Sequence, residues 1–72
     1  MITPQEIKDL IEAGLPDARA RVSGDGHHFE ATVVSPAFQG KTRIQQHQLV
    51  YAALGDRMRE QIHALSLKTD LP

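Results

Sequence analysis

Because its 72 residues include no apolar stretch long enough for a membrane span or a signal peptide, we expect one small, soluble, cytoplasmic domain, residues 1–72. The chain has no cysteine, so it cannot form disulfides or supply a thiolate, and any metal must be bound by His, Asp or Glu side chains. Eight basic and nine acidic side chains give a net charge of −1, which argues against strong, nonspecific nucleic-acid binding driven by phosphate neutralisation.

The first predicted element is a helix over residues 4–13. Thr3 can cap its free N–H groups, and Glu6 can reach back to complete a capping box. Ile2 and Ile7 are placed to form a hydrophobic staple across the helix start. A glycine and a proline follow the last apolar turn and end the helix.

Two strands joined by a tight turn are predicted next. Residues 18–22 alternate small apolar side chains with arginines, as in a half-exposed strand. The turn, residues 23–26, contains two glycines that can supply positive φ angles. The second strand, residues 28–34, has its most apolar face at Phe29, Ala31 and Val33, which a helix must cover because a two-stranded hairpin is not stable alone.

The second half of the chain is predicted to hold two helices and a closing strand. A loop over residues 35–40 precedes a helix from about residue 42, and Gly55 interrupts that helix. Asp56 can cap the second, short helix, and residues 63–69 alternate as a strand. The apolar positions assigned to the longer helix are Ile44, Val50, Tyr51, Ala53 and Leu54.

The predicted order is therefore helix, strand, strand, helix, helix, strand. Helices between the second and third strands favour a parallel pair formed by a right-handed crossover. We expect an α+β fold with a mixed three-stranded sheet and helices on one face, similar to the class II KH arrangement.

Histidines are the candidate functional residues of this cysteine-free chain. His63 lies where a helix ends and a strand begins, and its imidazole can bind a metal. The alternative role for His63 is to cap the helix C-terminus, where a partly charged imidazole meets the negative end of the helix dipole.

Five short motifs resemble those of the BolA family over about residues 24–69. The motifs are His28-Phe29, Val33-Val34-Ser35, Phe38-Gln39-Gly40, His47 with Val50-Tyr51, and His63-Ala64-Leu65. The resemblance implies a noncatalytic adaptor that partners a monothiol glutaredoxin to bind or transfer a two-iron two-sulfur cluster, in iron and redox homeostasis and stress response. The alternative is a small nucleic-acid-binding transcriptional regulator with a KH-like fold.

The same resemblance implies that His63 is an iron ligand and that a second ligand comes from the turn between the first two strands. That turn is short here and lacks the family's cysteine, so the pattern departs from both family branches. We favour His27, with His28 and Asp25 as alternatives; the histidines can also be ordinary solvated turn residues. The partner's cysteine and glutathione would supply the thiolates, and no cluster is expected in the isolated chain.

Basic residues after position 40 are candidate contacts for a protein partner or a nucleic acid. They are Lys41, Arg43, His47, Arg57 and Arg59. The alternatives are that His47 packs against Tyr51 and that Lys41 and Arg43 are ordinary solvated charges. Because no Ser/His/acid or Cys/His constellation is identifiable, we expect no enzymatic activity.

Overall fold

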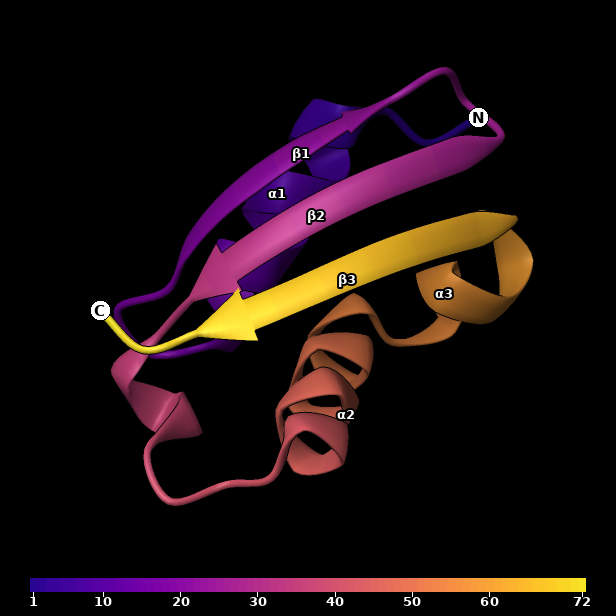
Figure 1. Ribbon diagram of the computed structural model, residues 1–72. Coiled ribbons are helices and arrows are strands. Elements are labelled where there is room, and N and C mark those ends of the chain that lie inside the picture. The colour runs from indigo at the N-terminus through magenta and orange to yellow at the C-terminus, as the bar shows by residue number, and fades with distance from the viewer.

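Helices and strands follow one another in the predicted order in the computed structural model, which describes all residues, 1–72 (Figure 1). The predicted loop after the second strand contains one short 3-10 helix, and the other boundaries agree with the predicted ones to within two residues. In chain order the elements are α1 Pro4–Gly14, β1 Arg19–Gly24, β2 His28–Val34, η1 Pro36–Phe38, α2 Arg43–Leu54, α3 Asp56–Glu60 and β3 Ala64–Asp70.

The sheet has the order β1-β2-β3, with β1 antiparallel and β3 parallel to the central strand. In Figure 1, α1 lies behind β1 and β2, and α2 packs against both α1 and β3. The predicted mixed sheet with helices on one face is confirmed. The other face is uncovered, and Arg21, Thr32 and Lys68 lie side by side across it in register.

The start of α1 has the predicted capping box. The Thr3 hydroxyl accepts a hydrogen bond from the Glu6 N–H at 3.1 Å, and the Thr3 N–H donates to the Glu6 carboxylate at 3.2 Å. Ile2 and Ile7, the predicted staple residues, are both buried. They belong to a core of apolar side chains between the helices and the sheet: Ile2, Ile7, Ile11, Leu15, Ala20, Phe29, Ala31, Val33, Phe38, Val50, Leu54 and Ile62.

The predicted apolar face of α2 is partly wrong. Val50 and Leu54 are buried, whereas Ile44 is 71% exposed and Tyr51 is 37% exposed. The helix carries apolar side chains on more than one side, and the sheet and α1 cover only one of them. When a helix has apolar residues on more than one side, their spacing in the sequence does not show which side is buried.

The predicted cap of α3 is also wrong. Gly55, with a φ of 59°, precedes the helix, and no side chain caps it. Asp56 is instead the first helical residue, and its carboxylate accepts a hydrogen bond from Arg59 at 2.8 Å. In the β1–β2 turn, only Gly26 of the two glycines has a positive φ. Gly24 remains in β1, where an added Cβ would lie 2.4 Å from the carbonyl oxygen of His28.

Candidate functional site

Parallel pairing of β2 and β3 places the starts of the two strands side by side. His28 is in register with Ala64, and the Ala64 N–H donates to the carbonyl oxygen of His27 at 3.2 Å. The imidazole rings of His28 and His63 lie edge to face, with centroids 6.3 Å apart and an angle of 82° between the planes. Both residues are exposed, so the rings form a two-histidine site open to solvent.

Asp25 organises the turn that carries the first of these rings. Its Oδ1 atom accepts hydrogen bonds from the main-chain N–H groups of His27 and His28, each at 2.9 Å. These two hydrogen bonds lower the pKa of the Asp25 carboxyl group, and the bond from the His28 N–H has the larger effect. The negative charge of Asp25 is thus held at the turn by the main-chain N–H groups of His27 and His28.

The alternation of β2 explains which turn histidine lies beside His63. Phe29 is buried under the helices, so His28, one residue earlier, points to the uncovered face. His27 meets β3 through its main-chain carbonyl group. The preference for His27 as the second ligand stays a prediction, and the observed ring pairing favours its alternative, His28.

The protein brings two imidazoles together but does not close a metal site. No group of three or more His, Asp, Glu or Cys side chains lies close enough to hold a metal ion. Two nitrogen donors leave positions open on any iron or zinc ion, which has at least four ligands in structural sites. These donors fit a metal centre that a second molecule completes.

Among the predicted contact residues, Arg43 and His47 lie close together. They line one side of a hollow of about 450 Å³, and Lys68, Thr69 and Asp70 of β3 are among the residues on the other side. The ring of His47 also lies edge to face against Tyr51, with centroids 6.5 Å apart. The expected neighbour of His47 is confirmed, and its position in the hollow is an additional finding.

The remaining predicted contacts do not line that hollow. Arg57 and Arg59 belong to α3, which follows the C-terminal end of α2, whereas Arg43 is at its N-terminal end. Helix α2 has 12 residues and is therefore about 18 Å long. Arg59 is moreover paired with Asp56 at 2.8 Å. Lys41 lies just before α2, outside the set of residues that line the hollow.

Two polar residues with structural roles near these sites were not assigned from the sequence. Gln46 accepts a hydrogen bond from the Thr69 hydroxyl at 2.6 Å, which joins α2 to β3, and donates to the carbonyl oxygen of Lys41 at 3.0 Å. Ser35 is fully buried and donates to the carbonyl oxygen of Pro16 at 2.9 Å. Ser35 follows an apolar strand, and Gln46 lies among other polar residues, so neither position in the sequence identifies its distant partner.

No helix is both long and apolar enough to cross a membrane. Among known families, the model described as BolA-like protein matches residues 10–72. SufE-like protein 1 of Arabidopsis thaliana is 37% identical over 70 residues, covering 93% of this chain but only 19% of that protein. The acid stress protein IbaG of Escherichia coli is 35% identical over 68 residues, covering 93% of this chain and 81% of IbaG.

Solved structures agree with these sequence matches. A bolA protein homologue from Coxiella burnetii superposes with a TM-score of 0.91 at 53% identity, covering 100% of this chain and 94% of that one. Yeast Fra2 superposes with a TM-score of 0.80 at 31% identity, covering 97% and 80% of the two chains.

Proposed function

This chain belongs to the BolA-like protein family, and on that premise we propose that it is a noncatalytic adaptor that partners a monothiol glutaredoxin. With that partner and glutathione it binds or transfers a two-iron two-sulfur cluster, in iron and redox homeostasis and in the stress response. The observation that carries the proposal is the exposed pair of imidazoles at His28 and His63. The relative IbaG is named an acid stress protein, which supports the link to stress.

The donor chemistry suits a shared cluster. Two histidines can complete a two-iron cluster whose other ligands are thiolates, as in Rieske centres. This chain has two adjacent imidazoles and no cysteine, so every thiolate must come from another molecule. A partner cysteine and the thiol of glutathione would supply them.

Mixing the protein with a cluster-loaded monothiol glutaredoxin and glutathione tests the proposal. We expect a one-to-one complex on size exclusion and a changed visible absorption spectrum, because imidazoles replace thiolates at one iron. Separate elution of the two proteins with unchanged spectra would remove the adaptor function.

Single substitutions in the same experiment identify the ligands. His63→Ala should abolish the spectral change but cost at most about 1 kcal/mol of unfolding free energy, because the side chain is exposed at a helix end. Gln61→Ala, at an exposed neighbour, should leave the spectrum unchanged. Comparison of His28→Ala with His27→Ala then decides which turn histidine is the second ligand.

A nucleic-acid-binding regulator is the second candidate, favoured by Arg43, His47 and Lys68 around one hollow. The separation of these residues from α3 limits the number of phosphates that can be neutralised together. We therefore expect duplex and single-stranded DNA to bind no more tightly than about 10⁻⁴ M at physiological salt. Submicromolar, sequence-selective binding in such titrations, lost in the Lys41→Glu/Arg43→Glu variant, would instead establish the regulator.

A further inference from the structure

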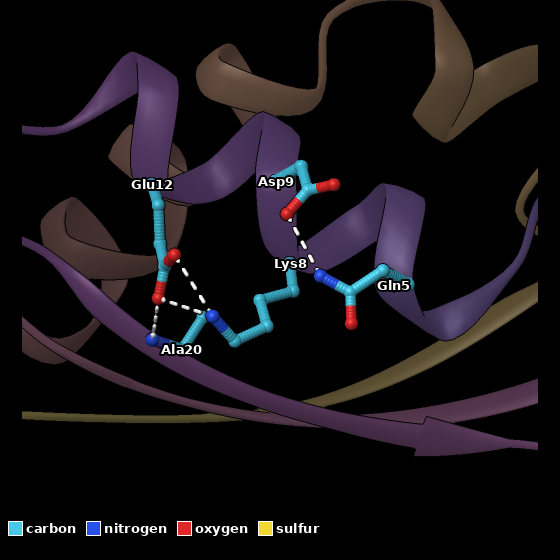
Figure 2. Close-up of polar contacts among 5 residues, drawn as sticks. All are labelled: Gln5, Lys8, Asp9, Glu12 and Ala20. Carbon is cyan, nitrogen blue, oxygen red and sulfur yellow. Dashed lines mark hydrogen bonds and ion pairs between the residues drawn. The ribbon is translucent and has the colours of Figure 1, made fainter.

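The β1 edge of the sheet is partly covered by α1. The outward N–H of Ala20 donates to Oε2 of Glu12 at 3.0 Å, and Lys8 holds the same carboxylate at 2.9 and 3.0 Å (Figure 2). A charged side chain bonded to an edge amide prevents another strand from pairing there. This edge is therefore protected by the chain itself.

Helix α2 packs beside β3, but no side chain is hydrogen-bonded to the outward main-chain groups of the β3 edge. The Ala64 N–H donates to His27, and the Asp70 carbonyl oxygen accepts from the Ser35 N–H, so the even-numbered residues of β3 face inward. Inward and outward groups alternate along a parallel strand. Leu65, Leu67 and Thr69 therefore direct their main-chain N–H and C=O groups outward, where no group of this chain bonds them.

The hollow beside this edge carries excess positive charge. It is lined by Arg43 and His47 of α2 and by Lys68 of β3, with Asp70 as the single carboxylate. Neither Arg43 nor Lys68 is in an ion pair with another residue of the chain. An acidic side chain that entered the hollow would meet two unpaired cations.

We propose that the β3 edge accepts an extended segment of a protein partner as a fourth strand, with an acidic side chain of that segment in the hollow. Strand addition supplies main-chain hydrogen bonds, and a side-chain pocket adds specificity. The identity of the partner rests on the proposed adaptor function. The presence of unpaired main-chain groups on the β3 edge does not depend on that function. Because His63 immediately precedes β3, the added strand would extend towards the two-histidine site.

The chemistry of the edge favours a polypeptide over the two other occupants. Outward N–H and C=O groups follow one another along β3. Only a partner that has both hydrogen-bond acceptors and hydrogen-bond donors can pair with all of them. Phosphate oxygens only accept hydrogen bonds, so contacts with a phosphate backbone would leave the outward carbonyl groups without donors. A second copy of this chain would bring its own Arg43 and Lys68 towards the same cations.

Amide hydrogen exchange measured by NMR tests the proposal on the complex with cluster-loaded monothiol glutaredoxin and glutathione. We expect exchange at Leu65, Leu67 and Thr69 to slow by at least about tenfold on binding. Val22 is the internal control, because its main-chain N–H, like that of Ala20, points outward from β1. Amide exchange at Val22 should not change on binding. A complex that forms without slower exchange at the three β3 amides overturns the proposal and leaves the adaptor function intact.

Chemical synthesis of this short chain permits a sharper control. Methylation of the main-chain nitrogen of Leu67 removes one outward donor and keeps the side chain, and it should weaken the complex about tenfold. The same methylation at Val22 should leave affinity unchanged. Charge reversal at the hollow, Lys68→Glu, should also weaken binding, whereas Arg19→Glu on the uncovered face of β1 should not. Equal affinities within each matched pair would overturn the proposal.

A blocked synthetic peptide of alternating valine and glutamate, as long as β3, separates this inference from the adaptor function. If glutaredoxin fails to bind but the peptide slows exchange at the three amides, the edge proposal stands and the adaptor function fails. If neither ligand slows exchange, or if only duplex DNA does so, the edge proposal is wrong.

Discussion

At the scale of single residues, Glu12 joins two elements that are separate in sequence. Its carboxylate accepts hydrogen bonds from the Ala20 N–H of β1 and from the Lys8 side chain one turn earlier in α1. Both hydrogen bonds lower the pKa of Glu12, and the bond from the Ala20 N–H has the larger effect. A lowered pKa means that the folded protein favours the ionised carboxylate more than the unfolded chain does.

Glu12 should therefore make stability depend on pH in the acid range. Its contribution is complete above the pKa of an unfolded glutamate, about 4.3, and is lost as pH falls through the lower pKa of the folded protein. Urea unfolding between about pH 2 and 6 should show a smaller acid loss of stability in Glu12→Gln than in the unmodified protein. Glu60→Gln, at an exposed residue of α3, is the matched control, and an acid loss as large in Glu12→Gln as in this control would contradict the assignment.

The residue-scale predictions from sequence were strongest where the interaction is local. The capping box of Thr3 and Glu6 spans three positions, so the sequence specified it directly. The pairing of His28 with His63 depends on strand register, and the Thr69–Gln46 bond depends on how α2 sits on β3. Neither distance nor orientation across separate elements follows from spacing along the chain.

At the scale of elements, α1 and α2 pack closely at one point where no side chain intervenes. A Cβ added at Gly14 would lie 2.7 Å from the Cβ of Ala53, which is shorter than a carbon–carbon contact allows. Glycine is thus required here by helix packing. The sequence suggested only that Gly14 helps to end α1, because the identity of the facing residue was unknown.

Gly14→Ala should lower the unfolding free energy by about 1–3 kcal/mol through overpacking. In an Ala53→Gly background the same change should be neutral or stabilise by up to about 1 kcal/mol, because the clash is gone and alanine favours the helix. Ala52→Gly, an exposed neighbour on α2, provides the control background in which the full cost should persist. Urea midpoints measured by circular dichroism distinguish these results, and equal costs in all three backgrounds would exclude a Gly14–Ala53 clash.

At the scale of the whole molecule, the topology followed from sequence because few arrangements were open to it. Helices between the second and third strands favoured a parallel pair joined by a right-handed crossover, and the structure has that parallel pair. The difference between the protected β1 edge and the open β3 edge was not predictable in this way. It depends on one side chain of α1 reaching the sheet from outside.

The crossover between β2 and β3 also determines when the two-histidine site forms during folding. His28 and His63 belong to segments separated by η1, α2 and α3, so their approach requires closure of a long loop. Contacts of this kind form slowly compared with helices and hairpins. The rings are separate in a nascent chain and adjacent only after β3 has docked. A partner that needs both rings would therefore distinguish mature molecules from immature ones.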